Sequence, residues 1–178
     1  MENLYNVVPV QEHQIDILRA LAHETFVDTF ASMNTPENIA SYTLKTFSQK
    51  QVSSELNVLG SSFFFACFGD DIAGYLKLNT GAAQTEQDLP NAMEIERIYA
   101  KRSFLGKGVG KALMQKSIAE AKSANLDWLW LGVWEENERA IEFYKRQSFQ
   151  IFGQHDFFMG DELQRDILMK LLTTTNKA

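Results

Sequence analysis

Residues 92–134 place two strand-like segments around a glycine-rich turn and a helix, and this order restricts the fold more than any other feature. AMEIERIYA (92–100) alternates apolar and polar residues with period two, which is typical of a β-strand. A helical apolar pattern follows the glycines from Val109 to Ala121, and WLWLGVW (128–134) is apolar throughout. Strands that run parallel need such a crossover connection. The sequence therefore predicts a mixed α/β fold with a strand–glycine loop–helix–strand unit at its centre.

The rest of the chain predicts further strands and helices on both sides of this unit. Residues 4–10 predict a strand and residues 11–30 a helix. Thr35 and Ser48 are expected to cap two more helices, the second ending near Gly60. SSFFFACF and IAGYLKLNT predict a hairpin around GDD. NERAIEFYKRQ (137–147) predicts a helix, and FQIFGQHDFF and RDILMKLL two closing strands around a turn at MGDE (159–162).

Charge and cysteine content exclude several classes of protein. The net charge is −6, whereas a sequence-independent nucleic-acid binder would be basic. The acidic surface suits a cationic small molecule, although solubility alone explains it. The single cysteine, Cys67 in FFFACF, excludes a disulfide within the chain and is expected to be buried and inert. With no signal peptide, membrane-length apolar run or metal-ligand spacing in sight, we expect a cytoplasmic protein without a metal.

The glycines at 106, 108 and 110 open a helix, although each costs roughly 0.5–1 kcal/mol relative to alanine. A glycine-rich turn at a helix N-terminus offers free backbone N–H groups to an anion, typically a phosphate. The spacing excludes the P-loop, because Leu105 stands at its first glycine position and Ala112 follows Lys111. It also excludes the G-x-G-x-x-G of dinucleotide and kinase loops. Another phosphate-bearing ligand, or a flexible turn without a ligand, fits the spacing.

The spacing resembles the acetyl-CoA loop of the GNAT superfamily of N-acetyltransferases, [QR]-x-x-G-x-[GA], placed on Leu105, Gly108 and Gly110. Leu105 departs from the family's Gln or Arg. Residues 137–149 are similar to the family's N-x-x-A-x-x-F-Y-x-x-x-G-F, with Ser148 in place of the glycine. The resemblance implies a GNAT-like α+β fold, a mixed and mostly antiparallel twisted sheet of about seven strands flanked by helices. It also implies one acetyltransferase domain over residues 1–178.

Several phrases along the whole chain are similar to bacterial spermidine/spermine N-acetyltransferases of the PaiA type. They are ETFVDTF, NTPENI, EIERIY, LWLGVWEENERAIEFYK and FMGDELQRDILM. This resemblance implies transfer of an acetyl group from acetyl-CoA to a polyamine such as spermidine or spermine, by direct attack on the thioester. The partner would be a small-molecule amine, not a nucleic acid or a membrane, and the protein a monomer or a homodimer. Residues 11–59 would form the acceptor side and residues 93–149 the acetyl-CoA core.

The GNAT resemblance also implies which residues hold the co-substrate. Backbone groups at Ile98, Tyr99 and Ala100 would pair with the pantetheine arm, and one N–H there would polarise the thioester carbonyl. Asn137 would contact the co-substrate, and it can also cap its helix. The loop residues expected to hold the pyrophosphate, mainly through backbone N–H groups, are Leu105, Gly106, Lys107, Gly108, Val109, Gly110, Lys111 and Ala112.

Acetyl transfer needs a neutral amine and a stabilised leaving thiolate. By resemblance, Tyr144 donates a proton to the departing sulfur and also lies against the co-substrate; its other interpretation is a core tyrosine. Glu94 and Glu96 share a strand face if the strand is regular, and either could take the amine's proton, directly or through water. We favour Glu96 because it lies nearer the reactive arm. The competing interpretation is a solvated face or an ion pair with Arg97 or Lys101.

Carboxylates and aromatic rings in the N-terminal helices are candidates for binding the acceptor. A polyamine site should present both to dispersed ammonium charges. The candidates are Glu24, Asp28 and Tyr42; the alternative interpretation of these charges is a solvated helix face. A cleft could be lined by Trp128, Trp130 and Trp134; the alternative interpretation is that they pack in the core. Two alternatives stay open at this point: a GNAT enzyme for an amino acid, a drug amine or a protein amine, and a non-catalytic acyl-CoA-binding regulator.

Overall fold

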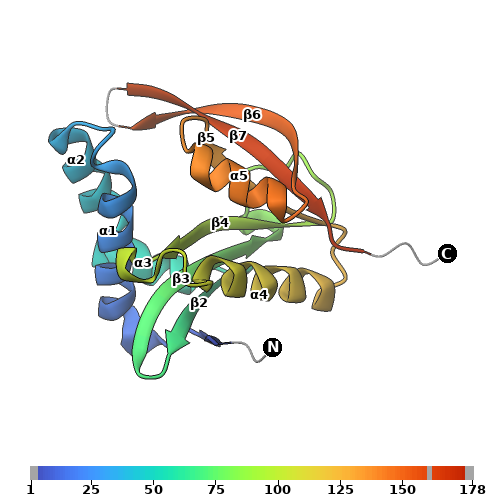
Figure 1. Cartoon of the computed structure of the whole chain (residues 1–178), viewed down its shortest axis with the longest axis horizontal. Helices are drawn as coiled ribbons and strands as arrows, with labels where there is room; N and C mark the ends of the chain where they lie inside the picture. Colours follow the sequence, from blue (N-terminus) through green and yellow to red (C-terminus); the bar gives the residue numbers. More distant parts are fainter. Residues whose placement is uncertain (1–3, 160–161, 175–178) are drawn as a thin grey trace.

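A seven-stranded sheet forms the centre of the computed structural model, which describes residues 4–159 and 162–174 (Figure 1). The strand order is β1-β2-β3-β4-β5-β7-β6, and every neighbouring pair is antiparallel except β4 and β5. The strands are β1 (Asn6–Pro9), β2 (Ser61–Phe68), β3 (Asp71–Thr80), β4 (Ala92–Ala100), β5 (Trp128–Trp134), β6 (Gln150–Met159) and β7 (Glu162–Leu172). The predicted fold class and strand number are confirmed.

Helices cover both faces of the sheet. The α-helices are α1 (Ile15–Phe30), α2 (Pro36–Thr46), α3 (Gln49–Leu56), α4 (Val109–Ser123) and α5 (Glu138–Arg146), and the 3₁₀ turns are η1 (Glu12–Gln14), η2 (Gly81–Ala83) and η3 (Arg102–Phe104). The predicted caps are confirmed, since the Thr35 side chain accepts from the Asn38 N–H and Ser48 from that of Gln51, both at 3.2 Å. These caps satisfy backbone donors that a helix start leaves free.

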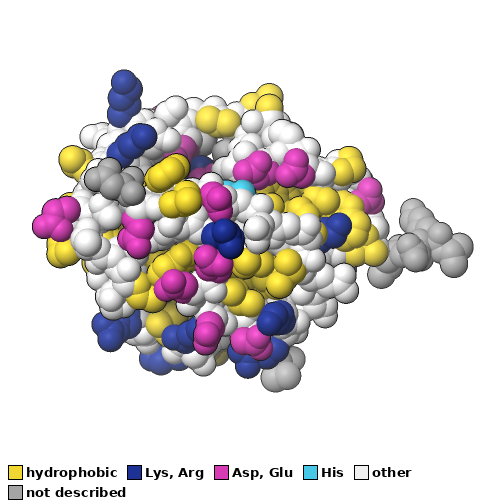
Figure 2. Space-filling view, turned by 90° about the horizontal axis from the view of Figure 1, so that it is seen from above, with side chains coloured by type: hydrophobic (Ala, Val, Ile, Leu, Met, Phe, Trp, Pro, Cys, Tyr) yellow, Lys and Arg dark blue, Asp and Glu magenta, His cyan; other side chains and the backbone are white. Residues whose placement is uncertain are grey.

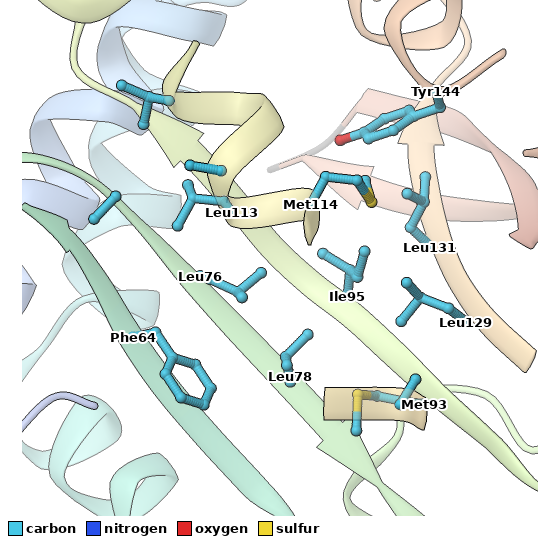
Figure 3. Packing of buried hydrophobic residues seen from close by; sticks show 14 of the residues in the cluster. Phe64, Leu76, Leu78, Met93, Ile95, Leu113, Met114, Leu129, Leu131 and Tyr144 are labelled. Atoms are coloured by element: carbon cyan, nitrogen blue, oxygen red, sulfur yellow. The ribbon is translucent and has the colours of Figure 1, made fainter. Parts of the chain in front are cut away.

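Two hydrophobic clusters lie on opposite faces of the sheet. The first packs α4 and α5 against the strands, with Leu113 and Met114 from α4 and Leu76, Ile95 and Leu131 from the sheet (Figure 3). The second packs α1, α2 and α3 against the other face, with residues such as Phe26, Phe65 and Tyr75. Alternate residues of a strand point to opposite faces, so β3 supplies Leu76 to one cluster and Tyr75 to the other. Helices on both faces account for strands that are apolar throughout.

Most predicted element bounds agree with the structure. The predicted strands at 92–100 and 128–134 match β4 and β5 to the residue, while the first strand is shorter than predicted. The last strand begins at Glu162 instead of Arg165, because β6 and β7 continue to pair toward their connection. Residues 160–161 of the predicted MGDE turn lie outside the described residues.

Candidate functional site

The parallel strands β4 and β5 pair over only three residues and then separate. The pairs run from Ala92 and Trp128 to Glu94 and Trp130. From Ile95 onward β4 pairs with β3 alone, and from Leu131 onward β5 pairs with β7 alone. Within the described residues, the two facing edges thus keep backbone N–H and C=O groups without a strand partner. Such edges can pair with an extended ligand as an added strand would.

A β-bulge lies where the two strands separate. In the β3–β4 ladder Leu78 pairs with Ile95 and Lys77 with Arg97, so Glu96 is the extra residue. A bulge re-aims side chains and is frequent next to active sites. Here Glu94 and Glu96 still converge, because both carboxylates accept from the Asn79 amide, at 3.0 and 2.5 Å. The strand is therefore not regular at Glu96, yet the two carboxylates still meet at one amide group.

The glycine-rich turn leads from the end of β4 to the start of α4. Gly106 and Gly108 have φ of 76° and 93°, a left-handed conformation that suits glycine. Gly108 is the N-cap and supplies no capping side chain. Among the described residues the first α4 amide that donates is that of Ala112, to the Gly108 carbonyl (3.0 Å). The amides of Val109, Gly110 and Lys111 therefore point out of the helix start, where the helix dipole also attracts an anion.

Two aromatic side chains that the sequence reasoning missed fix the position of this turn. The Tyr5 hydroxyl donates to the Lys107 carbonyl at 3.0 Å, across 102 residues of chain. Phe143 of α5 lies 3.5 Å from the position that a Cβ on Gly110 would occupy. The third glycine thus lets α5 approach α4. No local pattern around Tyr5 could have indicated its long-range contact.

Tyr144 lies on α5 against the α4 face of the sheet. Its side chain is buried and packs on Phe143 and Phe149, at ring distances of 5.4 and 5.8 Å. Figure 3 shows its hydroxyl directed toward Met114 and α4. Burial raises the Tyr144 pKa far above its usual value. The phenol therefore keeps its proton at neutral pH, which is the state of a donor and not of a base.

The segment around α5 shows both of the expected local features. The Asn137 side chain accepts from the Ala140 N–H at 3.2 Å, so its role as a helix cap is confirmed. Ser148, where the family motif has glycine, has φ of 69°. The Ser148 N–H donates to the Lys145 carbonyl (2.9 Å) and the Phe149 N–H to that of Tyr144 (3.1 Å). This is the left-handed helix ending that glycine fits best.

The two candidate bases differ in their surroundings. Glu94 is 3% exposed and accepts from the Thr85 N–H (2.8 Å), the Thr85 hydroxyl and the Asn79 amide. Burial raises the Glu94 pKa, and these hydrogen bonds offset part of the shift. The Glu96 side chain is 20% exposed and lies 2.6 Å from Lys77 Nζ and 3.3 Å from Arg97. The ion pair with Arg97, one competing interpretation of Glu96, is thus present.

Glu96 belongs to a charged cluster that we call the Glu55 cluster: Glu55, Lys77, Glu96 and Arg97. Glu55, on α3, binds Arg97 in bidentate fashion (2.8 and 3.1 Å) and Lys77 Nζ (3.0 Å). Burial acts to raise the Glu55 pKa, but the two cations outweigh it and lower the pKa. Two carboxylates and two cations balance in charge. The cluster thus connects α3 to the bulge of β4, and no pattern in the sequence indicated it.

The predicted acceptor residues of the N-terminal helices lie apart from these groups. Glu24 and Asp28 are exposed on α1, on the side away from its buried residues. Tyr42 of α2 stacks on Phe26 at 4.6 Å, and burial raises its pKa. The three stay a prediction, but the structure does not bring them together in one site. Of the three tryptophans, Trp130 and Trp134 are buried and Trp128 is half-buried, as core packing would have it.

The closing hairpin places two titratable side chains, Asp166 and His155, on the α1 face, and the sequence reasoning also missed this pair. Asp166 of β7 pairs in the ladders with Trp134 of β5 and with His155 of β6. Directly paired residues share a face, and Trp134 contacts Phe30 of α1. Burial raises the Asp166 pKa to about 6, although His155 acts against the shift. Their spacing could be found only once the pairing of β5, β6 and β7 was known.

Neither a metal site nor a membrane span is found in the part of the chain that the structure describes. No group of three or more His, Cys, Asp or Glu side chains is placed to hold a metal ion there. The described helices are too short or too polar to cross a bilayer.

Comparison with known proteins gives consistent results. The acetyltransferase (GNAT) family model matches residues 21–149. An uncharacterized N-acetyltransferase of Lactobacillus delbrueckii subsp. lactis is 40% identical over 164 residues, 92% of this chain and 95% of that protein. The spermine/spermidine N(1)-acetyltransferase of Bacillus subtilis is 26% identical over 88 residues, 49% of this chain and 58% of that protein. The PaiA N-acetyltransferase of Thermoplasma acidophilum, solved with coenzyme A, has a TM-score of 0.76 at 20% identity, over 94% of this chain and 98% of that one.

Proposed function

The chain belongs to the acetyltransferase (GNAT) family, and from that premise we propose that it acetylates a primary amine of a polyamine such as spermidine or spermine. The observation that carries the proposal is the separation of β4 and β5 beside the uncapped start of α4. An extended arm can pair with the free strand edge, and a phosphate can bind the helix start. Acetyl-CoA has both parts in one molecule.

The residues proposed to hold acetyl-CoA follow this path. The backbone of Ile98, Tyr99 and Ala100 on the free edge of β4 pairs with the pantetheine arm. The Tyr99 ring itself stacks on Tyr75 at 5.9 Å, on the α1 face, which leaves its main chain for this role. The pyrophosphate binds the turn from Leu105 to Ala112, where the amides of Val109, Gly110 and Lys111 point out of the helix start and Lys107 and Lys111 are exposed.

Two side chains carry the chemistry in this proposal. Glu96, the more exposed of the two carboxylates at the bulge, takes a proton from the acceptor ammonium, directly or through water. The amine nitrogen then attacks the thioester carbon, a C–N bond forms and the C–S bond breaks. Tyr144, whose buried phenol is neutral, gives its proton to the leaving sulfur. The new amide nitrogen then gives up its extra proton, which returns through water to the Tyr144 oxygen and restores the phenol. A backbone N–H of the free β4 edge polarises the carbonyl.

The polyamine acceptor is supported by likeness to a named spermine/spermidine acetyltransferase over half of the chain and by the net charge of −6. We propose that residues 11–59 contribute to the acceptor side and residues 93–149 to the acetyl-CoA core of one domain over residues 1–178.

A panel of amines tests the proposal. Purified protein is given acetyl-CoA with spermidine, spermine, amino acids, aminoglycosides or a peptide amine, and thiol release is followed. We expect the highest kcat/KM with the polyamines. Activity on another class alone would make the protein a GNAT enzyme of different specificity. Binding of acetyl-CoA without turnover on any amine would favour a regulatory acyl-CoA-binding role.

A further inference from the structure

The carboxylates near the bulge of β4 are already neutralised or hydrogen-bonded within the protein. In the Glu55 cluster, Lys77 and Arg97 each contact both Glu55 and Glu96 at 3.3 Å or less. Glu94 accepts from Thr85 and Asn79. A ligand with several positive charges therefore needs a further carboxylate that still lacks a cation.

Asp166 meets this requirement. Its side chain is 22% exposed, and no lysine or arginine of the described residues lies within 4.0 Å of its carboxylate; the nearest basic side chain is the His155 imidazole, whose Nε2 lies 4.0 Å from Oδ2. The same oxygen lies 3.1 Å from the position that a Cβ on Gly132 would occupy. A side chain at position 132 would therefore crowd the carboxylate, and glycine leaves that space free. Trp134, its ladder partner on β5, adds an aromatic ring beside it.

A buried acceptor next to Asp166 also lacks a donor. Gln164 precedes Asp166 by two residues on β7, so both side chains point to the same face. The Gln164 side chain is 6% exposed, and its Nε2 donates to Asn34 Oδ1 at 2.8 Å. Its Oε1 is fully buried and has no hydrogen-bond partner in the described part of the chain. A buried acceptor without a donor is rare and points to a missing partner.

A second carboxylate, Glu86, lies on the other side of His155 from Asp166. Glu86, from the segment before β4, lies 3.7 Å from His155 Nδ1, which is itself buried without a hydrogen bond. Figure 2 looks down on the side where β6 and β7 lie and shows a histidine among acidic side chains. With its pKa near 6, Asp166 is charged at neutral pH although burial opposes that charge. A ligand cation would relieve this cost.

We infer that Asp166, together with Gln164 and His155, forms a second cation site that holds the ammonium group of the acceptor that is not acetylated. The inference rests on the proposed function and deepens it. Glu96 and the bulge lie on the β4 side of the separation, whereas Asp166 lies beyond β5. An acceptor that presents its reacting amine at the bulge and an ammonium group at Asp166 must carry two amino groups on one flexible chain. The substrate class is thus a diamine or polyamine and not a monoamine.

The test compares spermidine with hexylamine, a monoamine of similar chain type, in the wild type and in Asp166→Asn. We expect the wild type to prefer spermidine in kcat/KM, and Asp166→Asn to lose about tenfold or more on spermidine while hexylamine is unchanged. Asp156→Asn is the matched control, because Asp156 lies on β6, faces away from His155 and pairs with Arg165 at 3.2 Å. It should keep the preference.

Calorimetric titration of spermidine into each protein, with coenzyme A present, separates this inference from the proposed function. If no amine is acetylated but spermidine binding still depends on Asp166, the proposed function fails and the cation site stands. Three results would overturn the site: a wild type without preference for spermidine over hexylamine, a variant that loses both acceptors equally, and a variant that binds and acetylates spermidine as the wild type does. The first result is measured on the wild type alone, so the test does not depend on whether the variant folds.

Discussion

Single residues around the end of α5 have an unusual pKa or backbone conformation. Tyr144 and Ser148 lie four positions apart around the end of α5, and both depart from what their residue type does in solution. Burial raises the pKa of the Tyr144 phenol, and the ending of α5 holds Ser148 at positive φ. Each departure has a measurable consequence.

Tyr144→Phe should lower turnover about 100-fold, because a general acid contributes roughly 10²–10⁴ to rate. Acetyl-CoA affinity should be nearly unchanged, since the ring and its packing stay. The matched control is Tyr75→Phe, whose hydroxyl is also buried and has no partner among the described residues. Steady-state kinetics and calorimetry give both quantities. Equal turnover in wild type and Tyr144→Phe would remove the phenol from the mechanism.

Ser148→Gly should stabilise the protein by up to about 1 kcal/mol. A residue with a Cβ in the left-handed conformation costs roughly 1–2 kcal/mol of folding free energy, which glycine avoids. Glycine offsets part of this gain, because its more flexible unfolded chain loses roughly 0.5–1 kcal/mol more in entropy on folding. For a chain of this size the melting temperature would rise by up to about 2–4 °C, which differential scanning calorimetry resolves. A lower melting temperature would mean that the Ser148 side chain stabilises this turn.

At the scale of the elements, the proposed co-substrate site consists of backbone N–H and C=O groups that β4, β5 and the start of α4 leave without a partner. α4 begins without a capping side chain, and β4 and β5 separate after three pairs. The turn between β4 and α4 therefore matters through its backbone. Leu105 is 44% exposed, and its side chain is not needed to hold the turn.

Gly108→Val should abolish acetyl-CoA binding, because a β-branched residue opposes φ of 93° and adds a side chain at the start of α4. Gly69→Val is the matched control: Gly69 has φ of 57°, has no neighbour within 4 Å of an added Cβ, and lies in the β2–β3 turn. It should lose similar stability and keep acetyl-CoA binding. Leu105→Gln should leave the affinity nearly unchanged. Calorimetric titration decides, and normal binding by Gly108→Val would contradict a backbone site.

At the scale of the whole molecule, the electrostatic balance of the α1 face links stability to pH. The folded-state pKa of Asp166 is about 6, above its ordinary value of 3.8. A group whose pKa is raised by folding contributes stability below its unfolded pKa and loses that contribution as pH rises through the folded pKa. The wild type should therefore lose stability between about pH 4 and pH 6 on account of Asp166, which faces His155, with Glu86 beyond it.

Asp166→Asn should remove this loss. We expect the variant to unfold at a higher urea concentration than the wild type at about pH 7.5, and at the same concentration at about pH 4, where Asp166 is protonated. Urea unfolding curves at both pH values measure the difference. A variant less stable than the wild type at about pH 7.5 would mean that the Asp166 charge is stabilised by a partner in the folded protein.

Local pattern predicted most of this architecture, and long-range contact determined the rest. The period of residues 92–100, the caps at Thr35 and Ser48 and the glycine spacing are local, and the structure agrees with them. The bulge at Glu96, the Glu55 cluster and the neighbourhood of Asp166 depend on which strands pair and in which register. Hydrophobic periodicity indicates which apolar residues are buried, but it gives no sign that charged residues such as Glu55, Lys77 and Asp166 are buried. The glycine turn and its helix were thus predictable from the sequence, whereas the charged groups buried between strands and helices were not.

Through the proposed co-substrate site, the three-residue pairing of β4 and β5 would also tie the lifetime of this protein to metabolism. A sheet interrupted at its centre is incomplete until an extended molecule completes it, so binding adds to the free energy of unfolding. At a co-substrate concentration 100 times its dissociation constant the gain is about 2.7 kcal/mol. The unfolded fraction, on which proteases act, would fall about 100-fold. A cell rich in acetyl groups would keep this catalyst, and a starved cell would clear it faster, with no dedicated regulator.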